Sequence, residues 1–260
     1  MRKIIVLFLI IPFTCFSQIL KKDIEDKMVV FTFDDATASQ YSLVAPLLEQ
    51  YGFGATFFVC EFQPNFSDST KYMNWRQIKE LDKMGFEIAN HTRTHPDVGK
   101  LPKEKFIEEL NYIEAKFDSL NIRRSSAFAY PGYGISPSAI KTLEEEGYCF
   151  ARAGENRAYD PLRDHPLLVP SWAMNSENRS EIMNAFDEAR DGKIVVLTIH
   201  GVPDIEHPWV NTPPKLFEEY LQYLSENNFR VISLRELENY VDTELAMKLI
   251  EPHLNKSKAK

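Results

Sequence analysis

Short apolar runs alternate with amphipathic stretches along most of the chain. Strands buried on both faces read as continuous apolar runs. The runs predict these strands: Met28–Phe33, Ala55–Val59, Phe86–Ala89, Ser126–Tyr130, Cys149–Ala151, Leu167–Val169, Ile194–Ile199 and Arg230–Ile232. Between the runs, apolar residues recur at helical spacing. This spacing predicts these helices: Trp75–Met84, Leu101–Leu120, Ser136–Gly147, Asn178–Arg190, Pro213–Leu224 and one that begins at Asp242.

The order of these elements predicts an α/β fold. Repeated strand–helix units imply parallel strands with right-handed crossovers. About seven or eight such units suit a closed or nearly closed (β/α) barrel, and an open doubly wound sheet is the alternative. No internal repeat or linker interrupts the pattern, so residues 18–260 are expected to form a single domain. With 260 residues and 44% hydrophobic positions, the chain can bury a sizeable core.

The first 17 residues have the pattern of a secretory signal peptide. A basic start is followed by a short apolar run and small residues, which predicts cleavage between Ser17 and Gln18. The protein is then expected in the periplasm or outside the cell. A membrane anchor is the alternative, but it needs about 20 apolar residues, and Lys21 follows too soon, so no stable membrane span is expected. A lipoprotein site at Cys15 is a weaker alternative.

Charge and cysteine content exclude two further classes of protein. The net charge is −8, and no basic stripe appears beyond the last few residues, which argues against a nucleic-acid partner. Three cysteines are too few for a disulfide scaffold. Cys60 follows a predicted strand and Cys149 begins one, so in a parallel barrel they lie at opposite ends, too far apart for a disulfide. The oligomeric state is left open.

Polar or aromatic residues follow several of the predicted strands directly. Parallel α/β folds place their functional sites at the carboxyl ends of the strands. These residues are therefore expected at one mouth of the barrel: Asp34 and Asp35, His91 and His95, Gly132 and Tyr133, Trp172, and His200.

Some of these residues suit a metal site. Two adjacent aspartates at a buried strand end repel each other and need a cation or a basic partner, although a helix N-cap is an equal alternative for Asp34 or Asp35 taken alone. His91 and His95 can face one ion, and two histidines with one carboxylate leave open positions, as in catalytic zinc sites. His200 by itself is better explained as a packed core residue, and it gains weight only because other strand ends point to the same mouth.

Three motifs in this order resemble the polysaccharide deacetylase family. They are Thr32-Phe33-Asp34-Asp35, His91-Thr92-x-x-His95 and the segment from Leu197 to His200. The resemblance covers roughly residues 28–240 and points to the carbohydrate esterases of family 4, with a NodB-type homology domain. It implies a distorted (β/α) barrel of about seven parallel strands. It also implies metal-dependent removal of N- or O-linked acetyl groups from a carbohydrate.

The resemblance also implies roles for individual residues. Asp35, His91 and His95 would hold a divalent metal, most often zinc and sometimes cobalt or nickel. Asp34 would be the general base that activates water, and His200 the general acid that protonates the leaving group. Three further residues would hold the oxyanion or line the acetyl pocket: Gly132, Tyr133 and Trp172.

The chain departs from the family pattern at two positions. Ala129 stands where the family usually has an arginine that steadies the base, and Arg152, at the end of the next predicted strand, is a candidate replacement. Ser171 stands where the family usually has an aspartate. The candidate replacements for that acid are Asp160, Asp164 and Asp204. An alternative to the deacetylase is therefore a carbohydrate-binding pseudoenzyme that keeps the fold and metal site without turnover; a purely structural protein is the third hypothesis.

Overall fold

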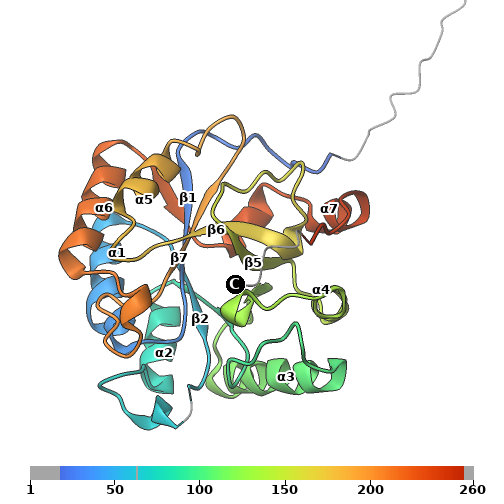
Figure 1. The fold of residues 1–260 in the computed structure, drawn as a ribbon, viewed down its shortest axis with the longest axis horizontal. Helices are drawn as coiled ribbons and strands as arrows, with labels where there is room; N and C mark the ends of the chain where they lie inside the picture. The colour runs from blue at the N-terminus through green and yellow to red at the C-terminus, as the bar shows by residue number, and fades with distance from the viewer. Residues whose placement is uncertain (1–17, 63, 255–260) are drawn as a thin grey trace, which may run out of the picture.

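Seven parallel strands close into a barrel in the computed structural model, which describes residues 18–62 and 64–254 (Figure 1). The strands are β1 (Met28–Phe33), β2 (Thr56–Val59), β3 (Glu87–Asn90), β4 (Ala127–Ala129), β5 (Phe150–Glu155), β6 (Val169–Ala173) and β7 (Val195–Ile199). The barrel closes because β1 pairs with β7 on one side and with β2 on the other. A short eighth strand, β8 (Arg230–Ile232), pairs with the first half of β1. The predicted distorted barrel is thus confirmed, and the open sheet is wrong.

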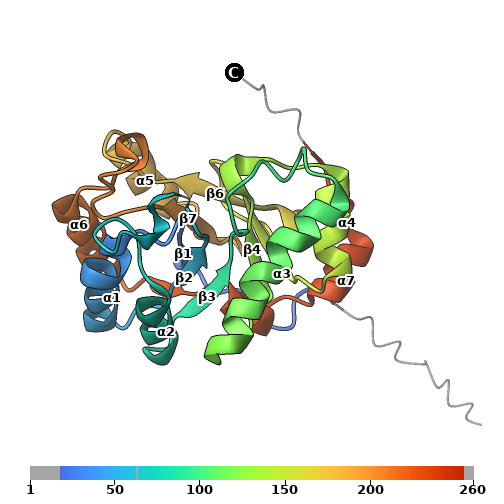
Figure 2. The ribbon, with the colours of Figure 1, turned by 90° about the horizontal axis from the view of Figure 1, so that it is seen from below.

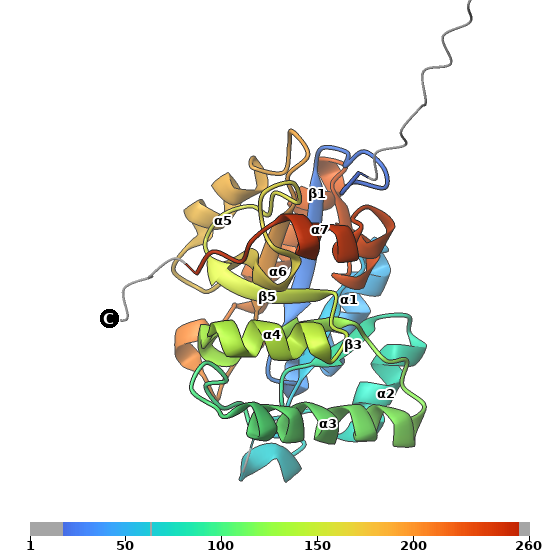
Figure 3. The same cartoon turned by 90° about the vertical axis from the view of Figure 1, so that its right-hand side faces the viewer.

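Seven α-helices surround the barrel in the described part of the chain. They are α1 (Ala45–Tyr51), α2 (Trp75–Lys83), α3 (Lys103–Leu120), α4 (Pro137–Glu145), α5 (Arg179–Phe186), α6 (Pro214–Glu226) and α7 (Thr243–Leu249). Figures 1 and 2 show α1, α2, α5 and α6 on one side of the barrel and α3, α4 and α7 on the other. Figure 3 shows α3 and α4, which contact each other, side by side.

Three segments differ from the elements that the sequence predicts. A π-helical stretch, Gln40–Val44, runs into α1, and neither is predicted, although Val44, Leu48 and Tyr51 fall at helical spacing. The strand predicted over Leu167–Val169 begins later, since Pro166–Leu168 forms a 3-10 turn and β6 runs over Val169–Ala173. In addition, β5 extends to Glu155, so Arg152 lies within a strand and not at its end.

The side chains of β1 alternate between two cores. Val29, Phe31 and Phe33 belong to the apolar cluster that includes residues of α1 and α6. Met28 and Val30 belong to a separate cluster with side chains of β2, β4 and β7. Successive side chains of a strand point to opposite faces, so the period of two carries an even-numbered residue inward at the end of β1. Asp34 is that residue.

The predicted leader, residues 1–17, lies outside the described residues. No helix in the described part of the chain combines the length and the apolar character that a membrane span requires. Cys60 and Cys149 are both free thiols, and Cys60 is buried. They sit at opposite ends of their strands, after β2 and before β5.

A buried carboxyl group joins several elements at the amino-terminal end of the barrel. Oε2 of Glu87 accepts hydrogen bonds from the Thr56 hydroxyl, at 2.6 Å, and from the Arg235 amide, at 2.8 Å. Oε1 accepts a hydrogen bond from the Ser125 hydroxyl at 2.6 Å. Burial raises the pKa of Glu87 above its usual value, against the opposing effect of these donors. One side chain thus links β2, β3, the approach to β4 and the turn after β8.

We expect Glu87→Ala to lower the free energy of unfolding by about 3 kcal/mol or more, because each buried donor left without a partner costs about 1–3 kcal/mol. Urea unfolding followed by circular dichroism measures this change. Glu87→Gln keeps the shape and one acceptor oxygen, so its loss should be smaller. Glu108→Ala, on an exposed face of α3, is the control. An unchanged urea midpoint for Glu87→Ala would show that the linkage does not stabilise the fold.

Candidate active site

Five polar side chains meet at the carboxyl-terminal mouth of the barrel, after β1, β3 and β7. Oδ1 of Asp35 lies 3.5 Å from Nε2 of His91 and 3.5 Å from Nε2 of His95. One ligand atom from each of these residues lies within 4.8 Å of the others. Asp34 is buried beside them, and Nε2 of His200 lies 3.8 Å from Oδ2 of Asp35. The structure thus brings together the residues that the three sequence motifs single out.

The loop after β3 is wound so that its two histidine rings face each other. Thr92 and His95 adopt left-handed backbone conformations, with φ of 66° and 55°. The Thr92 amide donates to Oδ1 of Asn90 at 2.9 Å, and the His95 amide donates to the Thr92 hydroxyl at 3.1 Å. The ring centroids of His91 and His95 are then 4.8 Å apart. A left-handed residue other than glycine costs about 1–2 kcal/mol, and such strain typically gathers at functional sites.

The donor set of Asp35, His91 and His95 fits a divalent metal ion. Nδ1 of His91 lies 2.8 Å from the carbonyl oxygen of Ala129 and donates to it, which leaves Nε2 as the acceptor nitrogen. This Nε2 atom is buried and has no hydrogen-bond partner among the described residues. A lone-pair nitrogen buried beside a second imidazole and a carboxylate is a suitable ligand for zinc or a similar ion.

The ionisation of the three residues also suits metal binding. Burial alone would raise the pKa of Asp35, but the neighbouring rings of His91, His200 and His95 lower the pKa below its usual value. Burial and the neighbouring His91 lower the pKa of His95 to about 4, so His95 is neutral at pH 7. Burial acts to lower the pKa of His91, but Asp34 and Asp35 raise it above its usual value. A metal ion must therefore displace a proton from His91 at mildly acid pH.

A fully buried arginine, Arg152, contacts the second aspartate. Nη2 of Arg152 donates to Oδ2 of Asp34, and Nη1 donates to the Thr198 hydroxyl at 2.8 Å. Because Thr198 accepts from the arginine, its own hydrogen is free to donate to the Ser171 oxygen, 2.7 Å away. The Ser171 hydroxyl in turn donates to the carbonyl of Ala153. Among the described residues, Asp34 is the only charged hydrogen-bond partner of the guanidinium, so the positive charge is directed at Asp34.

Arg152 is the residue that the sequence offers as a replacement for the family arginine. Ala129 and Arg152 are direct neighbours in the β4–β5 register. Ala129 and Arg152 thus lie at the same level of the barrel, and the arginine stands one strand further along the sheet. Thr198 gives no comparable signal in the sequence, because a threonine within an apolar strand is common.

His200 approaches both aspartates but lacks a partner on its far side. Its Nε2 atom lies 4.0 Å from Oδ2 of Asp34. Its Nδ1 atom is buried and has no hydrogen-bond partner among the described residues. Asp204 accepts from the Gly201 amide and lies 3.4 Å from His207, and the two other candidates, Asp160 and Asp164, contact Arg163 and Arg157. The expectation that one of these acids replaces the family aspartate beside His200 is therefore wrong.

Of the predicted pocket residues, the two after β4 form a turn at the site, whereas the one on β6 points away from it. Gly132 and Tyr133 form a left-handed turn, with φ of 54° and 56°. The Tyr133 amide donates to the Tyr130 carbonyl at 3.1 Å, so the Gly132 amide is the better candidate for an oxyanion donor. Trp172 is not brought to the site. Its ring packs against the helix-side core, and Nε1 is 3.4 Å from Glu188, because the neighbouring Ser171 takes the inward face of β6.

Two residues at the site are not named by the sequence reasoning. Gln40 is buried, and its side-chain amide donates to the carbonyls of Asp34 and His200, which ties the ends of β1 and β7 together. The Cys60 thiol lies 3.9 Å from Oδ1 of Asp35. Cys60 directly follows β2, so its place at the mouth was readable from the sequence. Gln40 lies in the unpredicted π-helical stretch and was not.

Comparison with known proteins gives consistent matches. A model of the polysaccharide deacetylase family matches residues 21–151. The chain is similar to a peptidoglycan-N-acetylglucosamine deacetylase of Bacillus cereus, with 28% identity over 216 residues, which are 83% of this chain and 90% of that protein. It is also similar to a bifunctional xylanase/deacetylase of Pseudobutyrivibrio xylanivorans, with 34% identity over 195 residues, 69% of this chain and 27% of that protein.

Two further matches show how much of a relative's length the chain spans and which fold it shares with a solved structure. A putative polysaccharide deacetylase of Bacillus subtilis is 26% identical over 123 residues, 47% of this chain, and the chain spans 43% of its length. Among solved structures, the family 4 carbohydrate esterase domain of a multidomain xylanase from the hindgut metagenome of Trinervitermes trinervoides superposes with a TM-score of 0.58. The match covers 89% of this chain and 96% of that one at 20% sequence identity, and so shows a shared fold.

We expect the protein to bind one zinc ion and Asp35→Asn to weaken that binding by about 100-fold or more, because the variant loses the anionic ligand. Isothermal titration calorimetry measures the affinity. Since the pKa of His91 is raised above its usual value, zinc binding should release more protons at pH 6 than at pH 8. Titrations in buffers with different ionisation enthalpies detect this difference.

Asp23→Asn, which changes an exposed carboxylate before β1, is the matched control and should bind zinc as the unmodified protein does. If Asp35→Asn also binds zinc unchanged, the three residues are not the metal site.

Proposed function

Because the chain belongs to the polysaccharide deacetylase family, we propose that it is a metal-dependent hydrolase that removes acetyl groups from a carbohydrate. The observation that carries the proposal is the convergence of one carboxylate and two imidazoles, Asp35, His91 and His95, within 4.8 Å. Asp34 and His200 lie beside this group. Two relatives are named a peptidoglycan-N-acetylglucosamine deacetylase and a bifunctional xylanase/deacetylase, so N-acetylated peptidoglycan and an acetylated xylan are both proposed substrates. Export through the predicted leader belongs to the same proposal.

Asp35, His91 and His95 would hold the metal, with zinc as the first expectation and cobalt or nickel as alternatives. When bound there, a divalent ion supplies Lewis-acid chemistry: it acidifies a water molecule and polarises the acetyl carbonyl.

Asp34 is the proton acceptor in this proposal. Arg152 and its neutral partners fix Oδ2 of Asp34 in one position. Oδ1 of Asp34 is buried and lacks a hydrogen-bond partner among the described residues, so it is the atom available to take a proton from the attacking water. A base that is held rigidly in reach of the proton it removes contributes about 10²–10⁴-fold to the rate.

His200 is the proton donor for the leaving group. Oδ2 of Asp34 and Oδ2 of Asp35 lie 4.0 and 3.8 Å from its Nε2 atom, and both attract a positive charge there. The water oxygen forms the new bond to the acetyl carbon, the bond from that carbon to the sugar nitrogen or oxygen breaks, and acetate leaves. The proton on Nε2 goes to the departing amine or alcohol, and the Gly132 amide would donate to the oxyanion.

A carbohydrate-binding pseudoenzyme is the second candidate. The observation that favours it is the buried Nδ1 atom of His200, which has no partner among the described residues to orient the ring. This candidate predicts saccharide binding without acetate release.

We expect acetate release from a panel of N-acetylglucosamine oligomers, peptidoglycan fragments and acetylated xylan, and we expect a chelator to abolish it. Asp34→Asn should lower kcat by about 10³-fold while zinc affinity stays within a few-fold, because the amide keeps the shape but does not accept the proton. Enzymatic acetate assays and calorimetry on the same preparations measure both. The control is again Asp23→Asn. Full turnover by Asp34→Asn would exclude Asp34 as the base. The absence of acetate release from every substrate would favour the pseudoenzyme.

The place of the arginine gives a separate test. Arg152→Ala should lower kcat/KM by about 100-fold, because Asp34 loses its electrostatic partner. Restoring an arginine one strand away, in the double variant Ala129→Arg/Arg152→Ala, should recover at least about 10-fold of that loss, since the two positions are neighbours in the β4–β5 register.

A loss caused by poor packing alone would not be recovered in the double variant. Equal zinc binding and thermal unfolding show that each variant is folded.

A further inference from the structure

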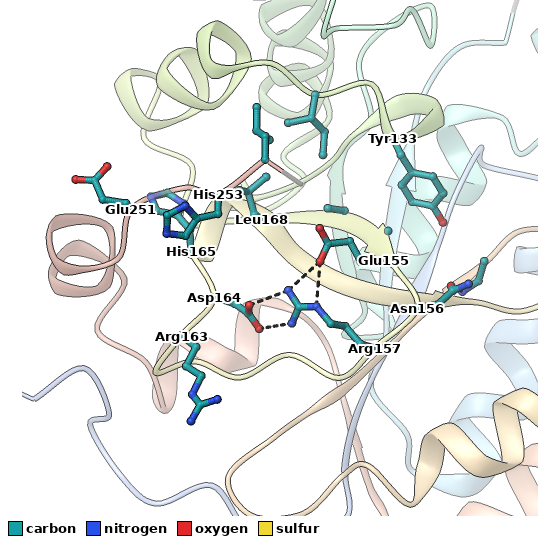
Figure 4. A pocket seen from close by; sticks show the side chains of 15 residues that line it. Tyr133, Glu155, Asn156, Arg157, Arg163, Asp164, His165, Leu168, Glu251 and His253 are labelled. Carbon is teal, nitrogen blue, oxygen red and sulfur yellow. Dashed lines mark hydrogen bonds and ion pairs between the residues drawn. The ribbon is translucent and has the colours of Figure 1, made fainter. Parts of the chain in front are cut away.

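A pocket of about 640 Å³ lies at the end of β5 and includes Tyr133, which follows the candidate oxyanion donor (Figure 4). The pocket and the candidate active site share Tyr133 as a wall. Tyr133 is the next residue after Gly132, the candidate oxyanion donor, and its ring centroid lies 5.5 Å from the guanidinium carbon of Arg152. The ring also covers Gly154, where an added Cβ would sit 3.4 Å from it. Asp35, His91 and His95 do not line this pocket, so the pocket is a cavity separate from the candidate metal site.

The inner wall of the pocket is an irregular strand end. The pairing of β5 with β6 shifts register between Arg152 and Glu155, and a bulge of this kind bends a strand and re-aims its side chains. Glu155 and Asn156 are left-handed, with φ of 88° and 50°. Arg157 holds the segment in place through two hydrogen bonds of 2.8 Å to Asp164 and one of 3.0 Å to Glu155. Backbone strain that is kept in place by a dedicated ion pair points to a functional segment.

The outer wall comes from the opposite end of the chain. Residues 251–254 follow α7, and α7 packs on the 3-10 turn Pro166–Leu168. Glu251, His253 and Leu254 line the pocket, and Figure 4 shows Glu251 and His253 on the same side of it as His165. The pocket therefore exists because the C-terminal segment lies across the end of β5.

The chemistry of the walls suits a neutral sugar. The pocket volume falls within the range of about 300–1,000 Å³ that is common for small-molecule sites. The Arg157 charge is neutralised by Glu155 and Asp164, so the pocket has no unpaired charge of that side chain to select an anion. The ring of Tyr133, 40% exposed, offers an apolar face to a pyranose, and the side-chain amide of Asn156 can donate to hydroxyl groups.

We propose that this pocket binds the sugar residue next to the acetylated one, and that the C-terminal segment Glu251–Leu254 makes the protein prefer oligosaccharides over single sugars. The proposal rests on the proposed function, because it places the acetylated residue at the metal site. A glycan whose acetyl group reaches Asp35 and the Gly132 amide passes the Tyr133 ring on its way out of the site, and the next ring enters the pocket.

The test compares the full chain with a variant that ends at Pro252, using N-acetylglucosamine oligomers of one to four residues and p-nitrophenyl acetate as probes. For the full chain, kcat/KM should rise with oligomer length. In the truncated protein that rise should shrink by about 10-fold, mainly through KM, since a remote subsite acts by binding. Hydrolysis of p-nitrophenyl acetate should not change.

Point variants keep the test valid if the truncated protein does not fold. His253→Ala/Leu254→Ala should reproduce the effect, and Leu249→Ala, an exposed leucine of α7 that does not line the pocket, is the matched control. An unchanged length dependence in both the truncated and the double variant would overturn the proposal.

Direct binding separates this proposal from the proposed function. N-acetylglucosamine tetrasaccharide, offered to the chelator-treated protein so that no turnover occurs, should bind the full chain more tightly than it binds His253→Ala/Leu254→Ala, whether or not acetate is released when metal is present. If no acetate is released but this difference in affinity persists, the proposed function fails and the subsite stands. If acetate is released and the affinities are equal, the subsite fails and the proposed function stands.

Discussion

The contact between Arg152 and Asp34 is the constraint on which the rest of the site depends. Both groups are buried in the mouth of the barrel, where an unpaired charge is strongly unfavourable. The surrounding residues fit this ion pair. The small side chain of Ala129, on the neighbouring strand, leaves room for the guanidinium. Thr198 accepts a hydrogen bond from the guanidinium and is itself paired with Ser171, and neither side chain carries a competing charge. The aspartate that carries the proposed base function is therefore held in place by an ion pair inside the barrel and by the strands that surround it.

Asp35, the carboxylate of the candidate metal site, also follows the end of β1, but its backbone conformation differs from that of the strand. The alternation of β1 turns Asp34 inward, so a regular strand would turn the next residue, Asp35, away from the mouth. Asp35 instead adopts a left-handed conformation, with φ of 72°, and its carboxylate faces His91 and His95. The loop after β3 contains left-handed residues for the same reason. Two adjacent acids can thus serve one site because the chain leaves the strand geometry between them.

The sequence predicts the positions of the site residues better than it predicts the directions of their side chains. Apolar runs locate the strands, and the residues after them locate the mouth, so Asp34, Asp35, His91, His95 and His200 are all found. The direction of a side chain depends on register, and a shift of one residue along a strand reverses it. Trp172 illustrates this: the predicted strand ends at Val169, whereas β6 continues to Ala173 and turns Ser171 inward and Trp172 outward. Long-range partners such as Gln40 carry no local pattern.

The two departures from the family pattern act on different halves of the proposed chemistry. Moving the arginine from the position of Ala129 to Arg152 changes the strand that supplies it but preserves a cation on Asp34. A serine at position 171 removes a charge, and Ser171 joins the neutral partners of that cation and does not contact His200. The proton-accepting side therefore keeps its electrostatic support, whereas the proton-donating side has two carboxylates near Nε2 and no partner at Nδ1 among the described residues. The arrangement of the described residues thus supports the proposed metal binding and base action more fully than the proposed acid action, which rests on His200 alone.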